Sequence, residues 1–339
     1  MQSAIVSTHL KQEDIDAIQH FIDVREADIG YRPISDQAWA ELGHGPVGRM
    51  FAVQLRDHAG RLCAYAQAVA PSPAVPPDPS PDAARPDRDW TIETAFDSRD
   101  PARITHLATH AMAAAVQAVL RAGGVNLTWV VQGPEPVHAQ VAETFGLTPR
   151  RRIFQMRRAL PTGLPVVITT RPFDLGRDLD DWVRVNQRAF AWNPEQGGWT
   201  AANVLARMDE KWFDANGFLI HERDGRMAGF CWTKLHPRSI QSSGKELSPA
   251  PLMGEIYVIA VDPDFHGLGL GHALTVAGLE SLAARGAIVG MLYVDADNDN
   301  AVRLYEKLGF VVARTDCLYE GQLRELGLPT LESSSETPG

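Results

Sequence analysis

In the second half of the chain, segments with the hydrophobic pattern of a strand alternate with segments that have the hydrophobic pattern of a helix. Runs rich in β-branched and aromatic residues predict strands, and longer stretches with apolar residues three and four positions apart predict helices. The predicted order is strand, strand, helix, strand, helix, strand, with strands at 226–235, 254–263, 290–297 and 311–320 and helices at 272–286 and 300–310. This order predicts helices packed on a twisted mixed sheet, an α/β (α+β) fold class.

The same order of elements recurs in the first half of the chain, with strands at 61–70, 89–97, 126–133 and 151–160 and helices at 104–124 and 136–147. The segments "AETFGL" and "YEKLGF" fall at the same place in the two copies. Such a repeat predicts two tandem units. We expect them at residues 1–160 and 165–322, with a disordered tail at 323–339 and an exposed loop in the Pro-rich segment 71–87.

The composition of the chain argues against several functional classes. The chain has 339 residues and a net charge of −10, which argues against a general nucleic-acid binder because such proteins carry a basic excess. No apolar run reaches the ~18–20 residues that span a bilayer, and the first residues do not resemble a signal peptide. The three cysteines are far apart, so neither a disulfide framework nor a metal site is expected. We expect a cytoplasmic monomer with a small-molecule substrate and no nucleic-acid or membrane partner.

The stretch "VDPDFHGLGLGHALT" joins a predicted strand to a predicted helix through three alternating glycines. Glycines let the backbone turn tightly, and free N–H groups at a helix N-terminus favour a phosphate. The glycines alone fit a phosphate cradle and a plain turn equally well. A dinucleotide-binding fingerprint and a Walker A loop both fit poorly, because the spacing is not GxGxxG and no Gly-Lys-Ser/Thr follows.

The downstream segment "LYVDADNDNAVRLYEKLGF" decides between these readings. Together with the glycine loop it resembles the GNAT acetyltransferase superfamily, in which the loop cradles the pyrophosphate of acetyl-CoA. The resemblance implies two tandem GNAT acyl-CoA N-acyltransferase domains, with acetyl-CoA as co-substrate. His266 stands where the superfamily pattern has Gln or Arg. The resemblance implies a cofactor site at Ile259, Ala260, Val261, His266, Gly267, Leu268, Gly269, Leu270, Gly271, His272, Asn298, Asp299, Asn300, Ala301, Val302 and Arg303.

The segments "EQGGW" and "GFCWTK", with the tandem arrangement, further resemble the mycothiol synthase family. The similarity is densest over 182–320 and only architectural over 1–160. It implies transfer of acetyl to the cysteinyl amine of Cys-GlcN-Ins (1D-myo-inositol 2-(L-cysteinylamino)-2-deoxy-glucopyranoside), the last step of mycothiol biosynthesis. The acceptor residues that it implies are Asp36, Glu195, Lys234, Glu255 and Tyr293. Asp36 could equally be an exposed helix cap.

The chemistry needs a base and an acid. An α-amine has a pKa of ~7.7–8.0 and must lose a proton before it attacks the thioester. Glu255, at the start of a central strand, is the candidate base, and a solvated carboxylate is the alternative. Tyr305 is the candidate acid for the thiolate, and a core tyrosine is the alternative. Backbone N–H groups of "YVIAV" are candidate donors to the thioester oxygen.

The first repeat lacks this machinery. Its counterpart of the glycine loop is "DSRDPARITHL", which has no glycine and contains a proline. Trp90 lies near the position of Glu255, and Ala142 near that of Tyr305. We therefore predict no acetyltransferase activity in the first unit. Two other functions stay open for the whole chain: a GNAT that acetylates a protein N-terminus or another small amine, and a non-catalytic CoA sensor.

Overall fold

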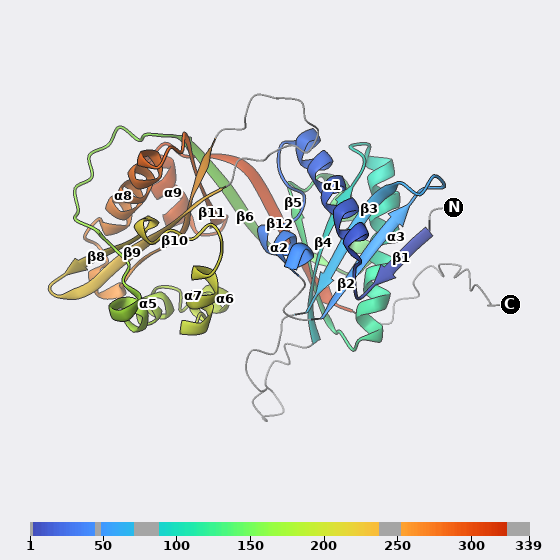
Figure 1. The fold of residues 1–339 in the computed structure, drawn as a ribbon, viewed down its shortest axis with the longest axis horizontal. Coiled ribbons are helices and arrows are strands. Elements are labelled where there is room, and N and C mark those ends of the chain that lie inside the picture. Colours follow the sequence, from blue (N-terminus) through green and yellow to red (C-terminus); the bar gives the residue numbers. More distant parts are fainter. Residues whose placement is uncertain (1–2, 45–48, 71–87, 237–251, 324–339) are drawn as a thin grey trace. The chain divides into compact units, whose positions relative to one another are not determined.

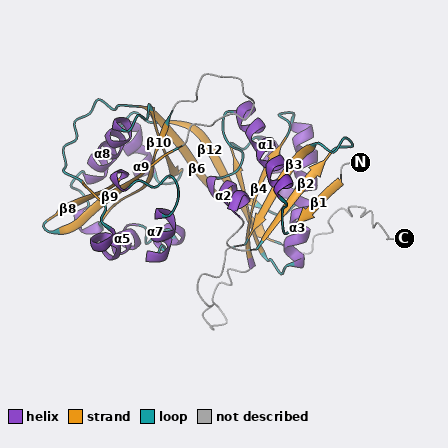
Figure 2. Cartoon of the chain, viewed as in Figure 1, coloured by secondary structure: helices purple, strands orange, loops and turns teal. Residues whose placement is uncertain are grey.

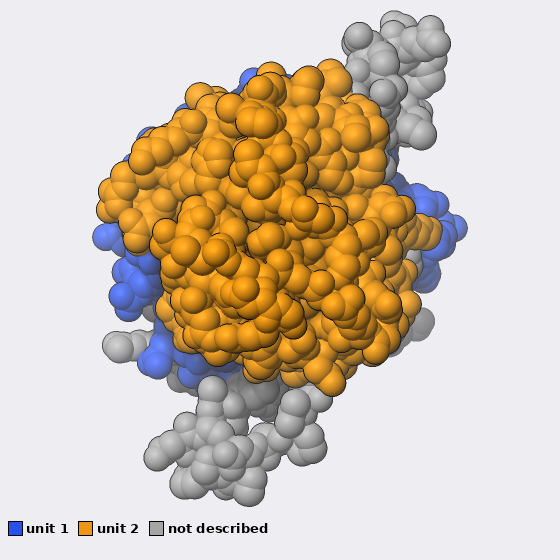
Figure 3. All heavy atoms as spheres, turned by 90° about the vertical axis from the view of Figure 1, so that its left-hand side faces the viewer, with its two compact units in different colours: residues 1–152, 241–243, 315–339 blue, residues 153–240, 244–314 orange. Residues whose placement is uncertain are grey.

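The computed structural model describes residues 3–44, 49–70, 88–236 and 252–323 (Figures 1 and 2). The Pro-rich segment 71–87 and residues 324–339 of the expected tail lie outside these ranges. The chain divides into two compact units, coloured separately in Figure 3. Unit 1 comprises residues 1–152, 241–243 and 315–339, and unit 2 comprises residues 153–240 and 244–314.

Unit 1 is built on a mixed sheet with strand order β1-β2-β3-β4-β5-β12, in which only β4 and β5 are parallel neighbours. Its elements are β1 (Ser3–Ser7), α1 (Gln12–Ile29), α2 (Asp36–His44), β2 (Met50–Arg56), β3 (Leu62–Val69), β4 (Asp89–Phe96), α3 (Pro101–Arg121), β5 (Asn126–Gln132), α4 (Pro136–Thr144) and β12 (Val311–Gln322).

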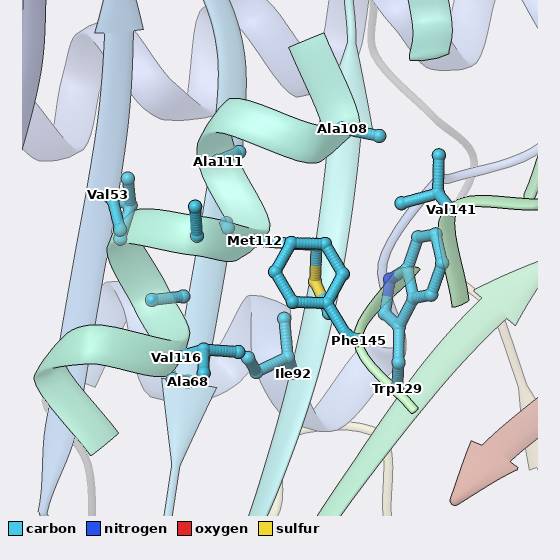
Figure 4. Close-up of a cluster of buried hydrophobic side chains, with 14 of the residues drawn as sticks. Val53, Ala68, Ile92, Ala108, Ala111, Met112, Val116, Trp129, Val141 and Phe145 are labelled. Atoms are coloured by element: carbon cyan, nitrogen blue, oxygen red, sulfur yellow. The ribbon is translucent and has the colours of Figure 1, made fainter. Parts of the chain in front are cut away.

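Helix α3 covers one face of the unit 1 sheet. Asp100 caps its N-terminus by accepting from the Arg103 N–H, and Pro101 occupies the first turn, where no N–H is needed. The small side chains of Ala108 and Ala111 let the helix lie close to the strands, where they pack with Ile92 and Trp129 (Figure 4). Helices α1 and α2 contribute a second apolar cluster, which includes Tyr65 and Ala95 of the sheet.

Unit 2 is built on a sheet with strand order β6-β11-β10-β9-β8-β7, in which only β10 and β11 are parallel. Its elements are β6 (Thr148–Ala159), which begins at the end of unit 1, β7 (Arg171–Pro172), α5 (Leu175–Ala189), α6 (Pro194–Gly197), α7 (Ala201–Met208), β8 (Phe218–Arg223), β9 (Arg226–Leu235), β10 (Met253–Val261), α8 (Leu270–Ala284), β11 (Val289–Asp295) and α9 (Asp299–Lys307).

Neighbouring residues of β9 show which helices cover which face of this sheet. Cys231 lies against Gly278 of α8, where an added Cβ would come within 2.4 Å of its sulfur. The next residue, Trp232, packs edge-on against Trp182 of α5, with ring centroids 6.0 Å apart. Side chains alternate between faces along a strand. Helices α8 and α5 therefore cover opposite faces, and an aromatic cluster fills the α5 side.

The last strand of each sequence repeat pairs in the sheet of the other unit. Residues Ile153 to Ala159 of β6 pair with β11, whereas Asp316 to Gln322 of β12 pair with β5. The units therefore differ from the expected division at residues 160 and 165. The order of elements along a chain does not specify the hydrogen-bond partner of a terminal strand, so the repeat pattern could not give this exchange. Leu323, expected in the tail, is buried, and its N–H donates to the Val125 carbonyl.

The two repeats share the turn that ends their second helix. The Leu147 N–H donates to the carbonyl of Ala142 at 2.9 Å, and the Phe310 N–H donates to that of Tyr305 at 3.0 Å. The preceding glycines, Gly146 and Gly309, both have positive φ. These matching contacts make Ala142 the counterpart of Tyr305, as the sequence repeat predicts. None of the helices described in the two units is long and apolar enough to cross a membrane.

Candidate active site

The glycine loop lies at the N-terminus of α8, and its glycines have different roles. Gly267 and Gly269 have φ values of +79° and +72°, in the left-handed region that L-residues rarely adopt. Gly269 is the N-cap of α8 and has no side chain to satisfy the free N–H groups of the first turn. Gly271 is already helical, and an added Cβ there would make an ordinary 3.6 Å contact with Leu304 of α9. The loop therefore presents uncapped backbone donors beside α9.

Ion pairs hold the stem of this loop. Asp262 is fully buried and accepts from the Asp264 N–H, and its carboxylate pairs with Arg184 and Arg188 at 3.2 Å. Asp264 pairs with Arg188 and Arg226, each at 2.6 Å. These arginines hold the pKa of the Asp264 carboxyl below its usual range, chiefly through their hydrogen bonds. The Nε2 atom of His266 lies 3.2 Å from the Val261 carbonyl oxygen, so the loop is also tied to the end of β10.

Helix α9 lies beside the first turn of α8, where Leu304 faces Gly271. Asn298 caps this helix by accepting from the Ala301 N–H at 3.2 Å, and Asn300 accepts from Arg303 at 2.9 Å. The loop and α9, which the sequence assigned to one cofactor site, are therefore adjacent. The capping contact also gives Asn298 a structural role.

An open pocket of about 740 Å³ lies beside the loop. Its lining comes from residues 167–169, 221–223 and 268–270, with His272 and Ala273. Neither Glu255 nor Tyr305 lines this pocket, so it lies away from the proposed reacting groups.

Strands β10 and β11 separate where the resemblance places the thioester. Their parallel pairing runs from Met253 opposite Val289 to Ile256 opposite Leu292 and is not continued in the described ladder. A bulge at Tyr257 shifts the register between β10 and β9, and the residues from Val258 onward pair only with β9. The N–H groups that β10 directs toward β11 beyond the bulge are thus outside the sheet ladder. Such fixed donors suit a developing oxyanion.

Three of the predicted acceptor residues lie on one face of the unit 2 sheet. Glu255 is directly opposite Lys234 of β9 and opposite Met291 of β11, so Tyr293, two residues after Met291, shares its face. Glu255 is 6% exposed and Lys234 is 8% exposed, so neither is a solvated surface group. The Lys234 ammonium lies 5.1 Å from the ring centroid of Trp212 and 5.8 Å from that of Tyr257.

Two further polar residues of this face were not found by sequence reasoning. The Nε2 atom of His236 lies 2.7 Å from Oε2 of Glu255. Gln155 of β6 donates through Nε2 to the hydroxyl of Tyr293 at 2.8 Å. His236 follows Lys234 at the spacing of a strand, and this alternation is the signal that could have found it. Gln155 belongs to the first sequence repeat, so no local pattern links it to Tyr293.

Tyr305 lies on the other side of the sheet. It is 8% exposed and packs edge-on against Phe310, within the cluster that contains Ile256 and Leu292. Burial raises the pKa of its phenol, so the hydroxyl keeps its proton at neutral pH. Because Ile256 and Glu255 are neighbours in a strand, the cluster that holds Tyr305 and the side chain of Glu255 lie on opposite faces of the sheet.

The remaining predicted acceptor residues are not brought into this face by the described contacts. Asp36 begins α2 in unit 1 and pairs with Arg32 at 3.5 Å. The capping contact of that helix comes from Ser35, whose Oγ accepts from the Ala38 N–H, so Asp36 is not the cap. Glu195 belongs to α6, and its side chain lies outside the described ones.

Unit 1 differs from unit 2 at each corresponding feature. The side chain of Asp100 occupies the N-terminus of α3, and the Asp97 carboxylate takes two hydrogen bonds from Arg103. Strand β4 pairs with β3 from Thr91 to Phe96 without a register shift. Glu255 is the third residue of β10 in the parallel ladder with β11, and Thr91 is the third residue of β4 in the parallel ladder with β5. Thr91 therefore corresponds to Glu255, and it is the neighbour of Trp90, which the sequence repeat placed near that position. A pocket of about 230 Å³ lies at the ends of β4 and β5.

Comparison with known proteins places these features in context. The model of the GNAT acetyltransferase family matches residues 182–310. The chain is 38% identical to a mycothiol acetyltransferase of Acidothermus cellulolyticus over 307 residues, 88% of each chain. It is 34% identical to a mycothiol acetyltransferase of Nocardia farcinica over 319 residues, which cover 91% of this chain and 95% of the relative.

Solved structures share the fold of the whole chain. A GCN5-related N-acetyltransferase from Sphaerobacter thermophilus superposes with a TM-score of 0.66 at 20% identity, covering 95% of this chain and 96% of the other. A tandem GNAT protein from the clavulanic acid biosynthesis pathway has a TM-score of 0.65 at 13% identity, with 96% and 100% covered. At these identities the likeness establishes the fold alone, which is the tandem GNAT architecture expected from the repeat.

Proposed function

Because the chain belongs to the family of mycothiol acetyltransferases, we propose that it transfers acetyl from acetyl-CoA to the cysteinyl amine of Cys-GlcN-Ins. The observation that carries this proposal is 38% identity over 88% of both chains to a relative with that name. The identity extends well beyond the 129 residues of the general acetyltransferase match at 182–310. The proposal therefore draws on the whole chain and not only on its glycine loop.

The cofactor side of the reaction is assigned to the loop and the two helices that meet there. Uncapped N–H groups at the start of α8 and the helix dipole favour the pyrophosphate of acetyl-CoA. An added Cβ at Gly267 or Gly269 would find no atom within 4 Å, so the loop backbone is open to a ligand. Acetyl-CoA supplies the thioester, and the chain's part is to hold it where β10 and β11 separate.

The acceptor side is assigned to the polar face that contains Glu255, Lys234 and Tyr293. Glu255 takes a proton from the ammonium nitrogen, directly or through a water, and the freed lone pair attacks the thioester carbon. Backbone N–H groups of β10 beyond the bulge stabilise the oxyanion. The C–S bond then breaks, and the Tyr305 hydroxyl gives its proton to the departing thiolate. The acylated nitrogen loses its second proton, which restores the Tyr305 hydroxyl through water, and Glu255 releases the first proton to solvent, so that a neutral amide and the free thiol remain.

The test is acetylation of Cys-GlcN-Ins compared with peptide amines under the same conditions, followed by release of free CoA and by mass spectrometry of the product. We expect N-acetylation of the cysteinyl amine with a kcat/KM at least about 100-fold above that for peptides, a discrimination of about 2.7 kcal/mol. A preference for peptide N-termini would overturn the proposed acceptor and leave the acetyltransferase assignment in place.

A further inference from the structure

The carboxylate that we assign as the base is held by a neighbouring histidine. The Nε2 atom of His236 lies 2.7 Å from Oε2 of Glu255, and the two side chains are 16% and 8% exposed. Among the residues that the structure describes, no other group forms a hydrogen bond with this carboxylate. Within the described ranges, the hydrogen-bonding constraint on the orientation of Glu255 therefore comes from His236.

The backbone fixes the position of His236. Its N–H donates to the Met253 carbonyl at 3.0 Å, so the ladder between β9 and β10 continues one residue past the end of β9. Lys234 is directly opposite Glu255, and His236 lies two residues further on the same face. The Lys234 ammonium is placed over the rings of Trp212 and Tyr257.

The chemistry requires one oxygen of the carboxylate to face the amine. A carboxylate is a modest base toward an ammonium, so its orientation and its distance from the proton matter more than its intrinsic basicity. An imidazole N–H that donates to Oε2 fixes the rotation of the carboxylate and leaves Oε1 for the acceptor. The proton then moves from the ammonium nitrogen to Oε1, and no bond at His236 is made or broken.

We propose that His236 is a positioning residue that orients the Glu255 carboxylate toward the acceptor amine. The inference rests on the proposed role of Glu255 as the base. It assigns a role to a residue that touches the base and not the reacting atoms.

Two substitutions at His236 separate the hydrogen bond from packing. Gln at 236 keeps an N–H donor at a similar reach, whereas Leu fills similar space without one. We expect His236→Leu to lower kcat about 10- to 100-fold, with the KM for acetyl-CoA and its binding affinity kept. We expect His236→Gln to lose no more than about threefold. Thermal unfolding and acetyl-CoA titration of both variants check that unit 2 is folded.

A double-mutant cycle with Glu255→Gln tests the coupling. If His236 acts through Glu255, adding His236→Leu to Glu255→Gln lowers kcat by no more than about twofold further. Equal losses in both backgrounds, or a His236→Gln variant as slow as His236→Leu, would overturn the inference.

The single variants distinguish failure of the role of His236 from failure of the proposed role of Glu255 as the base. Glu255→Gln with normal turnover would remove both the base assignment and the role of His236. Glu255→Gln with slow turnover and His236→Leu with normal turnover would leave the base in place and reject the histidine.

Discussion

Burial keeps the Tyr305 hydroxyl protonated to a higher pH than that of an exposed tyrosine. The phenol lies in an apolar cluster beside Phe310, and removal from water disfavours the phenolate, so its pKa is raised. The same burial is what a core tyrosine would show. Loss of the hydroxyl with the ring kept therefore distinguishes a proton donor from a core tyrosine.

Tyr305→Phe is expected to lower kcat about 10- to 100-fold, because the ring and its packing stay while the proton donor is lost. The KM for acetyl-CoA should change little. Tyr319→Phe, at a buried tyrosine of unit 1, is the matched control and should leave kcat unchanged. Steady-state kinetics at saturating acceptor measure both variants. A raised KM with an unchanged kcat would make Tyr305 a binding residue.

Glu93 of unit 1 is a buried acid outside the proposed active site. Burial raises its pKa from 4.5 to about 7, although the N–H and hydroxyl of Ser35 both contact its carboxyl group. The folded chain therefore binds this proton more tightly than the unfolded chain does. Stability from this group is complete below the unfolded pKa and is lost as the pH rises through the folded value.

The free energy of unfolding of unit 1 is expected to fall by up to about 3 kcal/mol between about pH 4.5 and about pH 8 through Glu93, at 1.36 kcal/mol per pKa unit. Glu93→Gln, which keeps both contacts with Ser35, should remove this part of the slope. Urea unfolding at several pH values measures it. An identical pH dependence in the variant would contradict the assignment.

At the scale of elements, the helix that follows the loop decides whether each unit can hold a phosphate. In unit 2 the N-cap residue of α8 is a glycine, which has no side chain to accept from the first N–H groups, so these donors stay free. In unit 1 the N-terminus of α3 is occupied by the carboxylate of Asp100, which repels an anion and already accepts a helix N–H. Helices α3 and α8 correspond in the two repeats, but the residues at their N-termini make α8 favourable and α3 unfavourable for an anion.

Gly269→Ala is expected to lower the free energy of unfolding by about 1 kcal/mol, because alanine is strained at a φ of +72°. The dissociation constant for acetyl-CoA should rise at least about tenfold as the loop changes shape. Gly271→Ala is the matched control for stability, since this helical position should tolerate alanine or gain up to about 1 kcal/mol. Thermal unfolding and calorimetric titration compare the two. Equal destabilisation would show that the positive φ is not the reason for glycine at 269.

At the scale of the whole molecule, two similar units carry unequal chemistry. Unit 2 has the uncapped loop, the bulge in β10, Glu255 and Tyr305. In unit 1 a side chain caps α3, and β4 pairs with β3 without a register shift. Thr91 and Ala142 stand at the places of Glu255 and Tyr305. We therefore propose that only unit 2 acetylates.

The full chain is expected to bind one acetyl-CoA, at unit 2, by calorimetric titration or equilibrium dialysis. A stoichiometry of two would contradict the view that Asp100 and Asp97 exclude the pyrophosphate from unit 1. The Gly269→Ala variant identifies the occupied unit, because weakening of the single site by this substitution assigns it to unit 2. One site with unchanged affinity in that variant would place acetyl-CoA elsewhere.

The sequence by itself determined the elements that carry the repeat, the glycine loop and the contrast between Tyr305 and Ala142. These features depend on side-chain periodicity and on residues a few positions apart, which local patterns record. It also determined the family, through identity spread along the chain. It did not determine the exchange of β6 and β12, because a strand can pair with any edge that presents free backbone groups. Only the tertiary structure placed His236 on Glu255 and Gln155 on Tyr293, since contacts between strands depend on register, which no single segment encodes.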